Sequence, residues 1–177
     1  MLKTMKNVNY LTESTLGDYL KILFNKEFIH NKVLFDKFKP DYRNDDLRLI
    51  IEFDGYNHYT TAKVALRDAF KDTKERELGY QIVRWPYFVQ ISRESIKYFL
   101  NIDVEIEQIY QHGFIDEHCV LPADFCELGI KKFIDDFMKF PEVIKLDIIS
   151  SLKYKIQVSK YGIYEVVPKA FIDVVDK

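Results

Sequence analysis

A run of apolar residues, LRLIIEFD from Leu47 to Asp54, ends in two carboxylates. Because side chains alternate along a strand, Ile50, Glu52 and Asp54 are expected on one face of it. Two desolvated carboxylates on one face repel each other and require a cation nearby. Mg²⁺ takes oxygen ligands and typically uses one or two carboxylates together with a substrate phosphate. The pattern therefore predicts a divalent-metal site at this end of the strand.

A third acid, Asp41, follows Pro40 on the other arm of a predicted hairpin whose turn is Asn44-Asp45-Asp46. Pairing across the turn brings Asp41 to within about two to four residues of Glu52, the usual uncertainty of element boundaries. The register itself stays open at this point.

The elements that must position these acids follow from spacing and turn residues. Thr12 caps a predicted helix over residues 12–24, with Glu13 in its first turn. Strands are predicted over 28–35, 38–42 and 47–54, a helix from 60 or 61 to 78, and a strand over 80–85. A strand, a helix and a strand in this order imply a parallel pair.

Further helices are predicted over 92–100, continuing through 111 after a break, and over 123–139 and 142–156. The expected fold class is α/β, a mixed β-sheet flanked by helices with a small helical C-terminal appendage. We expect a core at residues 1–105 and a mostly helical extension of unknown role at 106–177.

Charge is distributed unevenly along the 177 residues. The net charge is −2, but residues 60–100 carry +3 and residues 101–150 carry −7. An anionic partner is expected near the middle segment, whereas the acidic 101–150 segment is a candidate surface for a second copy or another protein. The absence of a long apolar run or a signal-peptide pattern leads us to expect a cytoplasmic protein without a membrane partner.

The predicted helix after Thr60 carries one basic face. Lys63, Arg67, Lys71 and Lys74 fall within an arc of about 80° at the helical spacing of about 100° per residue. Such a stripe can follow a phosphate backbone and give sequence-independent affinity for nucleic acid, although a solvated helix face has the same pattern.

Several segments together resemble one enzyme superfamily. Lys39-Pro40-Asp41 is followed by EFDGYNH from Glu52 to His58, by Arg67-Asp68, and by RELGYQIVRW from Arg76 to Trp85. In this order they resemble the PD-(D/E)XK nucleases, and most of all the small domains related to very-short-patch mismatch-repair endonucleases. The resemblance covers about residues 10–100 and implies a restriction-endonuclease-like core.

The resemblance also implies Mg²⁺-dependent, or Mn²⁺-dependent, hydrolysis of DNA phosphodiesters. Asp41, Glu52 and the Phe53 carbonyl would hold the metal, and Glu13 resembles the helix-borne acid that completes many such sites. Asp54 replaces the lysine of the E-x-K pattern, so it becomes a further ligand or helps to hold water. His58 or Lys63 would then supply proton transfer or positive charge.

The sequence thus favours a metal-dependent DNA endonuclease, either a repair-type nickase or a small restriction-like enzyme. Its catalytic residues are expected to be Asp41, Glu52, Asp54, His58 and Glu13. DNA contacts are expected at Lys63, Arg67, Lys71, Lys74 and Arg84. The alternative is an inactive nuclease-fold module that binds nucleic acid or a protein partner, which the missing lysine favours.

Overall fold

The computed structural model describes residues 10–106, 109–110, 112–115, 119–158 and 160–177. These residues form one mixed sheet in the order β1 (Ile29–His30), β2 (Tyr42–Asn44), β3 (Leu49–Asp54) and β4 (Gln81–Pro86). The β1–β2 and β2–β3 pairs are antiparallel, and the β3–β4 pair is parallel. This is the predicted α/β class with a mixed sheet.

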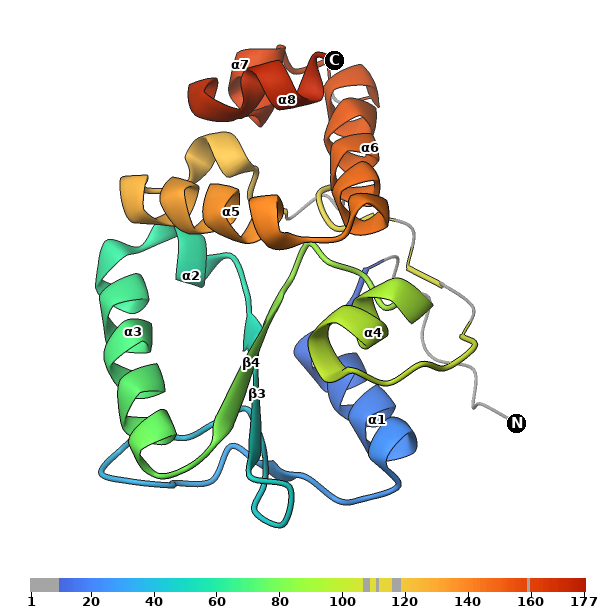
Figure 1. The fold of residues 1–177 in the computed structure, drawn as a ribbon. Helices are drawn as coiled ribbons and strands as arrows, with labels where there is room; N and C mark the ends of the chain where they lie inside the picture. Colours follow the sequence, from blue (N-terminus) through green and yellow to red (C-terminus); the bar gives the residue numbers. More distant parts are fainter. Residues whose placement is uncertain (1–9, 107–108, 111, 116–118, 159) are drawn as a thin grey trace.

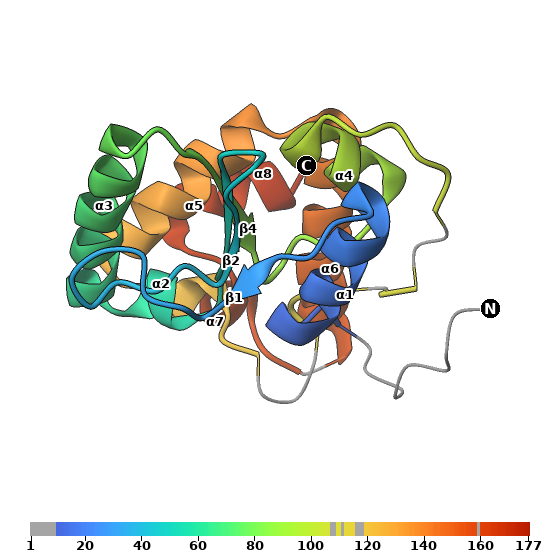
Figure 2. The same cartoon turned by 90° about the horizontal axis from the view of Figure 1, so that it is seen from below.

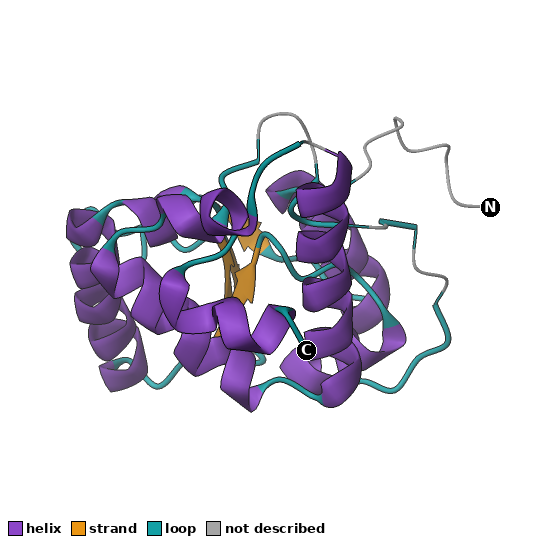
Figure 3. Ribbon diagram, turned by 90° about the horizontal axis from the view of Figure 1, so that it is seen from above, coloured by secondary structure: helices purple, strands orange, loops and turns teal. Residues whose placement is uncertain are grey.

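Helices cover both faces of the sheet (Figures 1 and 2). Helices α1 (Glu13–Phe24) and α4 (Arg93–Leu100) lie on one side, and α3 (Ala62–Glu77) lies on the other. The short helix α2 (Asn57–Thr60) connects β3 to α3. The strands therefore run between two groups of helices, as the view coloured by secondary structure shows (Figure 3).

Local sequence explains where these elements begin and end. Thr12 and Thr15 form a capping box at the start of α1, and Ser92 and Ser95 form another at α4. Gly79 adopts a positive φ of 86° after α3, a conformation that costs glycine little. The predicted helices over 12–24, 60–78 and 92–100 are confirmed within one or two residues at each end.

Strand parity separates an apolar face of β3 from a polar one. Leu49 and Ile51 pack with Trp85 and with Leu16 of α1 in one apolar cluster. Glu52 and Asp54 are buried on the opposite side, where they contact side chains of α3 and β4. The prediction that these two carboxylates share a face is confirmed.

Helix α3 packs with its polar face inward. Its buried residues are Asp68, Lys71, Asp72 and Glu75. In contrast, the side chains of Leu66 and Phe70 are exposed, at 64% and 51%. The buried face of α3 meets the two carboxylates of β3. Charge pairs therefore hold the helix on this side of the sheet, whereas most sheet–helix contacts in proteins are apolar.

The C-terminal helices pack across one end of the sheet (Figure 1). They are α5 (Glu127–Lys139), α6 (Glu142–Val158), α7 (Ile163–Val166) and α8 (Ile172–Val175), with 3₁₀ turns at Pro122–Asp124 and Lys169–Phe171. Tyr59 and Phe88 belong to the same buried cluster as Phe125 and Phe133. The predicted helical extension is present, and it shares its core with the sheet domain.

Glycine at position 129 allows α5 to approach α2 closely. A Cβ atom at Gly129 would lie 1.8 Å from the Tyr59 carbonyl oxygen. The same oxygen accepts a hydrogen bond from the Cys126 amide at 3.0 Å. Backbone contact therefore fixes α5 against the segment that follows β3.

Several predicted boundaries are wrong. The strand expected over 28–35 is reduced to Ile29–His30, and β2 (Tyr42–Asn44) overlaps the strand expected over 38–42 at Tyr42 alone. Among the described residues 101–106 and 109–110 there is no helix, and the expected 123–139 helix begins at Glu127. No helix in the described part of the chain has the length and apolar character needed to cross a bilayer.

Candidate active site

Asp41 and Glu52 are cross-strand neighbours at the open end of the β2–β3 hairpin. Tyr42 pairs with Ile51, so the next residues outward, Asp41 and Glu52, face each other. One Asp41 carboxylate oxygen, Oδ2, accepts a hydrogen bond from the Phe53 amide at 2.8 Å. This bond fixes the Asp41 side chain beside β3 and settles the register that the sequence left open.

The positive charge near these two carboxylates does not offset the effect of burial on their pKa values. Burial and then the charge of Asp41 raise the pKa of Glu52 to about 8, although Lys71 acts in the opposite direction. Burial also raises the pKa of Asp41, and the Glu13 carboxylate adds to this shift. Paired, desolvated carboxylates are the donor set that Mg²⁺ or Mn²⁺ would stabilise.

A lysine of α3 supplies one cation at this position. The Lys71 ammonium donates to Glu52 Oε1 at 2.7 Å and to the Lys39 carbonyl at 3.1 Å. Its side chain is only 9% exposed. The expectation that Lys71 belongs to an exposed DNA-binding stripe is therefore wrong, because its buried ammonium is bonded to Glu52.

Glu13 lies at the same cavity but is held by other partners. Its Oε1 atom lies 2.9 Å from His30 Nε2 and accepts a hydrogen bond from the Asn31 amide at 3.3 Å. The Tyr42 hydroxyl donates to the Glu13 backbone carbonyl at 2.9 Å. These contacts place Glu13 beside Asp41, where its carboxylate could accept a hydrogen bond from a water molecule bound at the acids.

Asp54 is enclosed in an ion-pair network. Its carboxylate lies 2.5 Å from Arg84 Nη1 and 3.2 Å from the Lys132 ammonium of α5. Burial alone would raise the pKa of Asp54, but these two cations outweigh burial and lower it. Asp54 therefore has cationic partners already and does not line the cavity at Asp41, contrary to its expected position in the active site.

The guanidinium donors of Arg84 are likewise bonded to carboxylates. Its guanidinium contacts both carboxylate oxygens of Asp72, at distances of 2.6 to 3.2 Å, as well as Asp54. The Arg84 side chain is 14% exposed. The expectation that Arg84 contacts DNA is therefore corrected, because its donors bind carboxylates inside the protein.

His58 lines the cavity and is oriented by an acid of α3. Its Nδ1 atom lies 2.5 Å from Asp68 Oδ2 and 3.4 Å from Asp54 Oδ1. Burial alone would lower the pKa of His58, but the bond to Asp68 and the charge of Asp54 outweigh burial and raise it. With Nδ1 engaged, Nε2 is the ring nitrogen that can exchange a proton with a ligand.

Two groups are candidates for a metal ion. Asp54, His58 and Asp68 each have a ligand atom within 4.8 Å of the others. However, Arg84 lies 2.5 Å from Asp54 and 3.8 Å from Asp68, so a cation there would face a buried guanidinium. Asp41 and Glu52 fit a divalent cation better because their charge is less compensated.

The Phe53 carbonyl, the third expected ligand, accepts a hydrogen bond from the Gly55 amide at 3.0 Å. A carbonyl oxygen has two lone pairs, so this bond leaves one acceptor direction for a metal. The Phe53 amide is bonded to Asp41, and both groups therefore help to define the end of β3.

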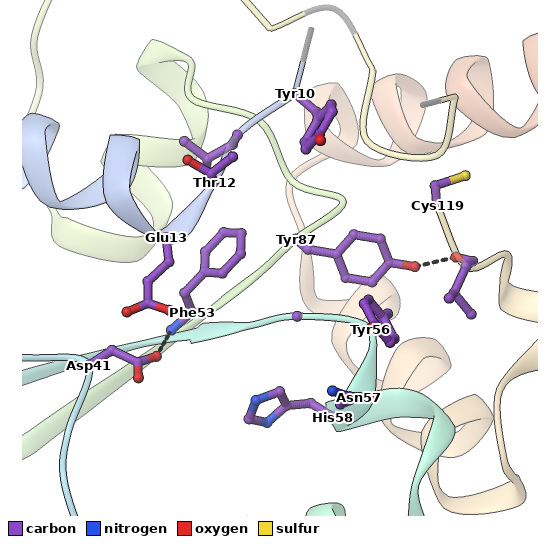
Figure 4. A pocket seen from close by; sticks show the side chains of 13 residues that line it. Tyr10, Thr12, Glu13, Asp41, Phe53, Tyr56, Asn57, His58, Tyr87 and Cys119 are labelled. Carbon is purple, nitrogen blue, oxygen red and sulfur yellow. Dashed lines mark hydrogen bonds between the residues drawn. The ribbon is translucent and has the colours of Figure 1, made fainter. Parts of the chain in front are cut away.

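A cavity of about 430 Å³ opens at the acids (Figure 4). Glu13, Asp41 and Phe53 lie at one end, and His58 lies along its wall. Aromatic side chains of Tyr10, Tyr56 and Tyr87 line the other end. The site thus combines carboxylates, an oriented imidazole and an apolar compartment in one hollow.

The basic stripe is reduced to three members. Lys63 and Arg67 are exposed on α3, and Lys74 is partly exposed and paired with Glu77 at 2.7 Å. These three cations can still meet a polyanion along the outer face of α3.

The inner face of α3 was not predicted from the sequence. Asp68, Lys71, Asp72 and Glu75 follow the i, i+3, i+4, i+7 spacing of one helix face, a signal that was visible. Nothing in that spacing says that this polar face is the buried one. Lys132 was missed because its partner, Asp54, is 78 residues away in the chain.

Comparison of the chain with protein-family models, with curated proteins and with solved structures finds no match. The function is therefore inferred from the geometry of the site and from the motifs of the sequence.

Proposed function

We propose that this protein is a metal-dependent endonuclease that hydrolyses DNA phosphodiester bonds. The observation that carries the proposal is the pair of facing carboxylates, Asp41, which lines the cavity, and Glu52, which is buried beside it. Burial raises the pKa of both groups, the charge of Asp41 adds to the rise at Glu52, and an ammonium lies 2.7 Å from Glu52. This arrangement suits a divalent cation and a phosphate better than a neutral ligand.

In this proposal Asp41, Glu52 and the Phe53 carbonyl hold Mg²⁺, with Mn²⁺ as an alternative ion. When bound, the metal would lower the pKa of a coordinated water and offset the charge that develops on the phosphate. Lys71 orients Glu52 through its 2.7 Å hydrogen bond and opposes the rise in the pKa of Glu52. Lys71 thus takes the role that the missing E-x-K lysine leaves vacant at Asp54.

His58 is the group best placed to move a proton. Asp68 holds its Nδ1 atom, so the imidazolium can donate from Nε2 to a leaving oxygen in the same cavity. Asp54 acts as a positioning residue through His58 and Arg84. Exposed Lys63 and Arg67 would contact the phosphate backbone outside the cavity. We place such an enzyme in the cytoplasm, where DNA would be accessible to it.

Nicking of supercoiled plasmid tests the proposal. We expect wild-type protein to convert it to open circles with Mg²⁺ or Mn²⁺ and not with EDTA. Glu52→Gln and Asp41→Asn should each lower the single-turnover rate at least ~100-fold, because each removes a charge needed at the metal. Asp46→Asn is the matched control, since the Asp46 side chain is 85% exposed on the hairpin turn.

Equal nicking by wild type and Glu52→Gln, purified in parallel, would reject this assignment. Binding of DNA without cleavage by any of the proteins would favour the inactive nuclease-fold module instead.

A further inference from the structure

The end of the cavity away from the acids is built from aromatic rings (Figure 4). Tyr10, Tyr56 and Tyr87 contribute their rings, and Val120 and Cys119 complete the wall. These residues come from the segment before α1, the β3–α2 connection, the turn that follows β4 and the segment before α5. The proposed reaction, hydrolysis at the acids, does not use this compartment.

One of the rings is fixed in place. The Tyr87 hydroxyl donates a hydrogen bond to the Val120 carbonyl. Its ring centroid lies 5.3 Å from that of Phe88 and 5.7 Å from that of Phe114, both in edge contacts. Because Phe88 and Phe114 are buried core residues, Tyr87 forms a rigid wall.

A second ring is presented to solvent. The Tyr56 side chain is 49% exposed and follows Gly55 at the end of β3. Asn57, the next residue, is exposed and also lines the cavity. A phenol ring at an open cavity offers a stacking surface, and the neighbouring amide offers one donor and one acceptor group.

A nucleobase fits this chemistry. Every base has a π-face, so stacking on aromatic side chains is strong and tolerant of sequence. A cavity of about 430 Å³ can hold a planar base and part of its sugar. A base inside a duplex is already stacked on both faces, so only an unpaired or extruded base can enter. Because Glu13 and Asp41 line the same cavity, a base held there places its strand at the acids.

We propose that the Tyr10–Tyr56–Tyr87 compartment binds an unstacked nucleobase, and that the preferred substrate is DNA with an unpaired nucleotide beside the cleaved phosphodiester. The inference rests on the proposed nuclease function for its biological meaning, but the binding step can be measured without cleavage. Tyr87 forms the fixed wall of the compartment, and Tyr56 is the stacking residue at its entrance.

The test uses two DNA duplexes that each contain one 2-aminopurine, which is unpaired in the first and paired in the second. One duplex carries 2-aminopurine as a one-nucleotide bulge, and the other carries it paired with thymine. Binding is measured by anisotropy with Ca²⁺ in place of Mg²⁺. We expect the bulged duplex to bind ~10-fold more tightly, with quenching of 2-aminopurine emission as the base stacks on a ring.

Substitutions at Tyr56 separate stacking from general affinity. Tyr56→Ala should abolish the ~10-fold preference, whereas Tyr56→Phe should retain it because the ring remains. The matched control is Tyr164→Ala, since Tyr164 is 70% exposed on α7 and does not line the cavity. Because Tyr56 is exposed, its replacement should not disturb folding, which a circular dichroism melt verifies.

Equal affinity for the two duplexes, or an unchanged preference in Tyr56→Ala, would overturn the inference. The preference together with an absence of Mg²⁺-dependent nicking would retain the base site and reject the nuclease. Nicking without any preference for the bulge would support the nuclease and reject the base site.

Discussion

At the scale of single residues, the molecule compensates its buried carboxylates unequally. Asp54 contacts Arg84 and Lys132 and has a lowered pKa, whereas Glu52 is hydrogen-bonded to Lys71 and has a raised one. The two acids are two residues apart on the same strand face, so their difference arises from tertiary partners. The less compensated acid, Glu52, faces Asp41, which lines the cavity, and this is why we propose the metal site there.

The raised pKa of Glu52 has a consequence for stability. Its pKa is about 8 in the folded protein, against an ordinary value of 4.5, so the folded state holds the extra proton between these values. Without divalent metal, the free energy of unfolding should therefore fall as the pH rises from about 5 to 8. One group contributes at most about 1.4 kcal/mol per pH unit.

Urea unfolding at pH 5, 6, 7 and 8 in EDTA measures this slope. Glu52→Gln should flatten it, because the amide does not titrate, and Asp46→Asn should leave it unchanged. Parallel slopes for wild type and Glu52→Gln would show that Glu52 is ionised throughout this range.

At the scale of elements, α3 determines the chemistry of the site. Its inward face provides Lys71 for Glu52, Asp68 for His58 and Asp72 for Arg84. An amphipathic helix normally buries its apolar side, and here Leu66 and Phe70 are on the outside. The helix is held through directed charge pairs, which also orient Glu52 and His58.

This inverted packing predicts an unusual pattern of mutational effects. Asp72→Ala should destabilise the protein by about 3 kcal/mol, because it leaves a buried guanidinium with one fewer carboxylate. Leu66→Lys should change stability by less than about 0.5 kcal/mol, since the Leu66 side chain is 64% exposed. Both values can be read from urea unfolding at pH 7. A larger loss in Leu66→Lys than in Asp72→Ala would contradict the observed orientation of α3.

At the scale of the whole molecule, the C-terminal helices complete the sheet domain. Lys132 of α5 contacts Asp54 at 3.2 Å and Asp136 at 2.8 Å, and its ammonium lies over the Tyr59 ring. Tyr59 and Phe88 are buried against Phe125 and Phe133. Residues of the predicted core at 1–105 and of the predicted extension at 106–177 therefore share one buried cluster.

We expect Lys132→Met to destabilise the protein by about 3 kcal/mol, because Asp54 would lose one of the two cations that compensate its burial. Lys131→Met is the matched control, since Lys131 is exposed on the same helix. Thermal unfolding followed by circular dichroism compares the two. Equal melting temperatures for the two variants would show that the Lys132–Asp54 contact contributes nothing measurable.

The sequence by itself determined the order of the elements and the faces of β3. Helix caps at Thr12 and Ser92, the stop at Gly79 and the alternation along β3 depend on neighbouring residues, so they could be predicted locally. The same local reasoning identified Asp41 and Glu52 as partners, because a hairpin brings its two arms together.

Only the tertiary structure decided which cation meets which acid. Lys71 and Lys132 approach β3 from helices that are separate in sequence, and a charged stripe on a helix has the same spacing whether it faces water or the core. Burial raises the pKa of Glu52, whereas Arg84 and Lys132 outweigh burial at Asp54, and these contacts exist only in the packed molecule. Electrostatic partners depend on distance in space, which local sequence patterns do not encode.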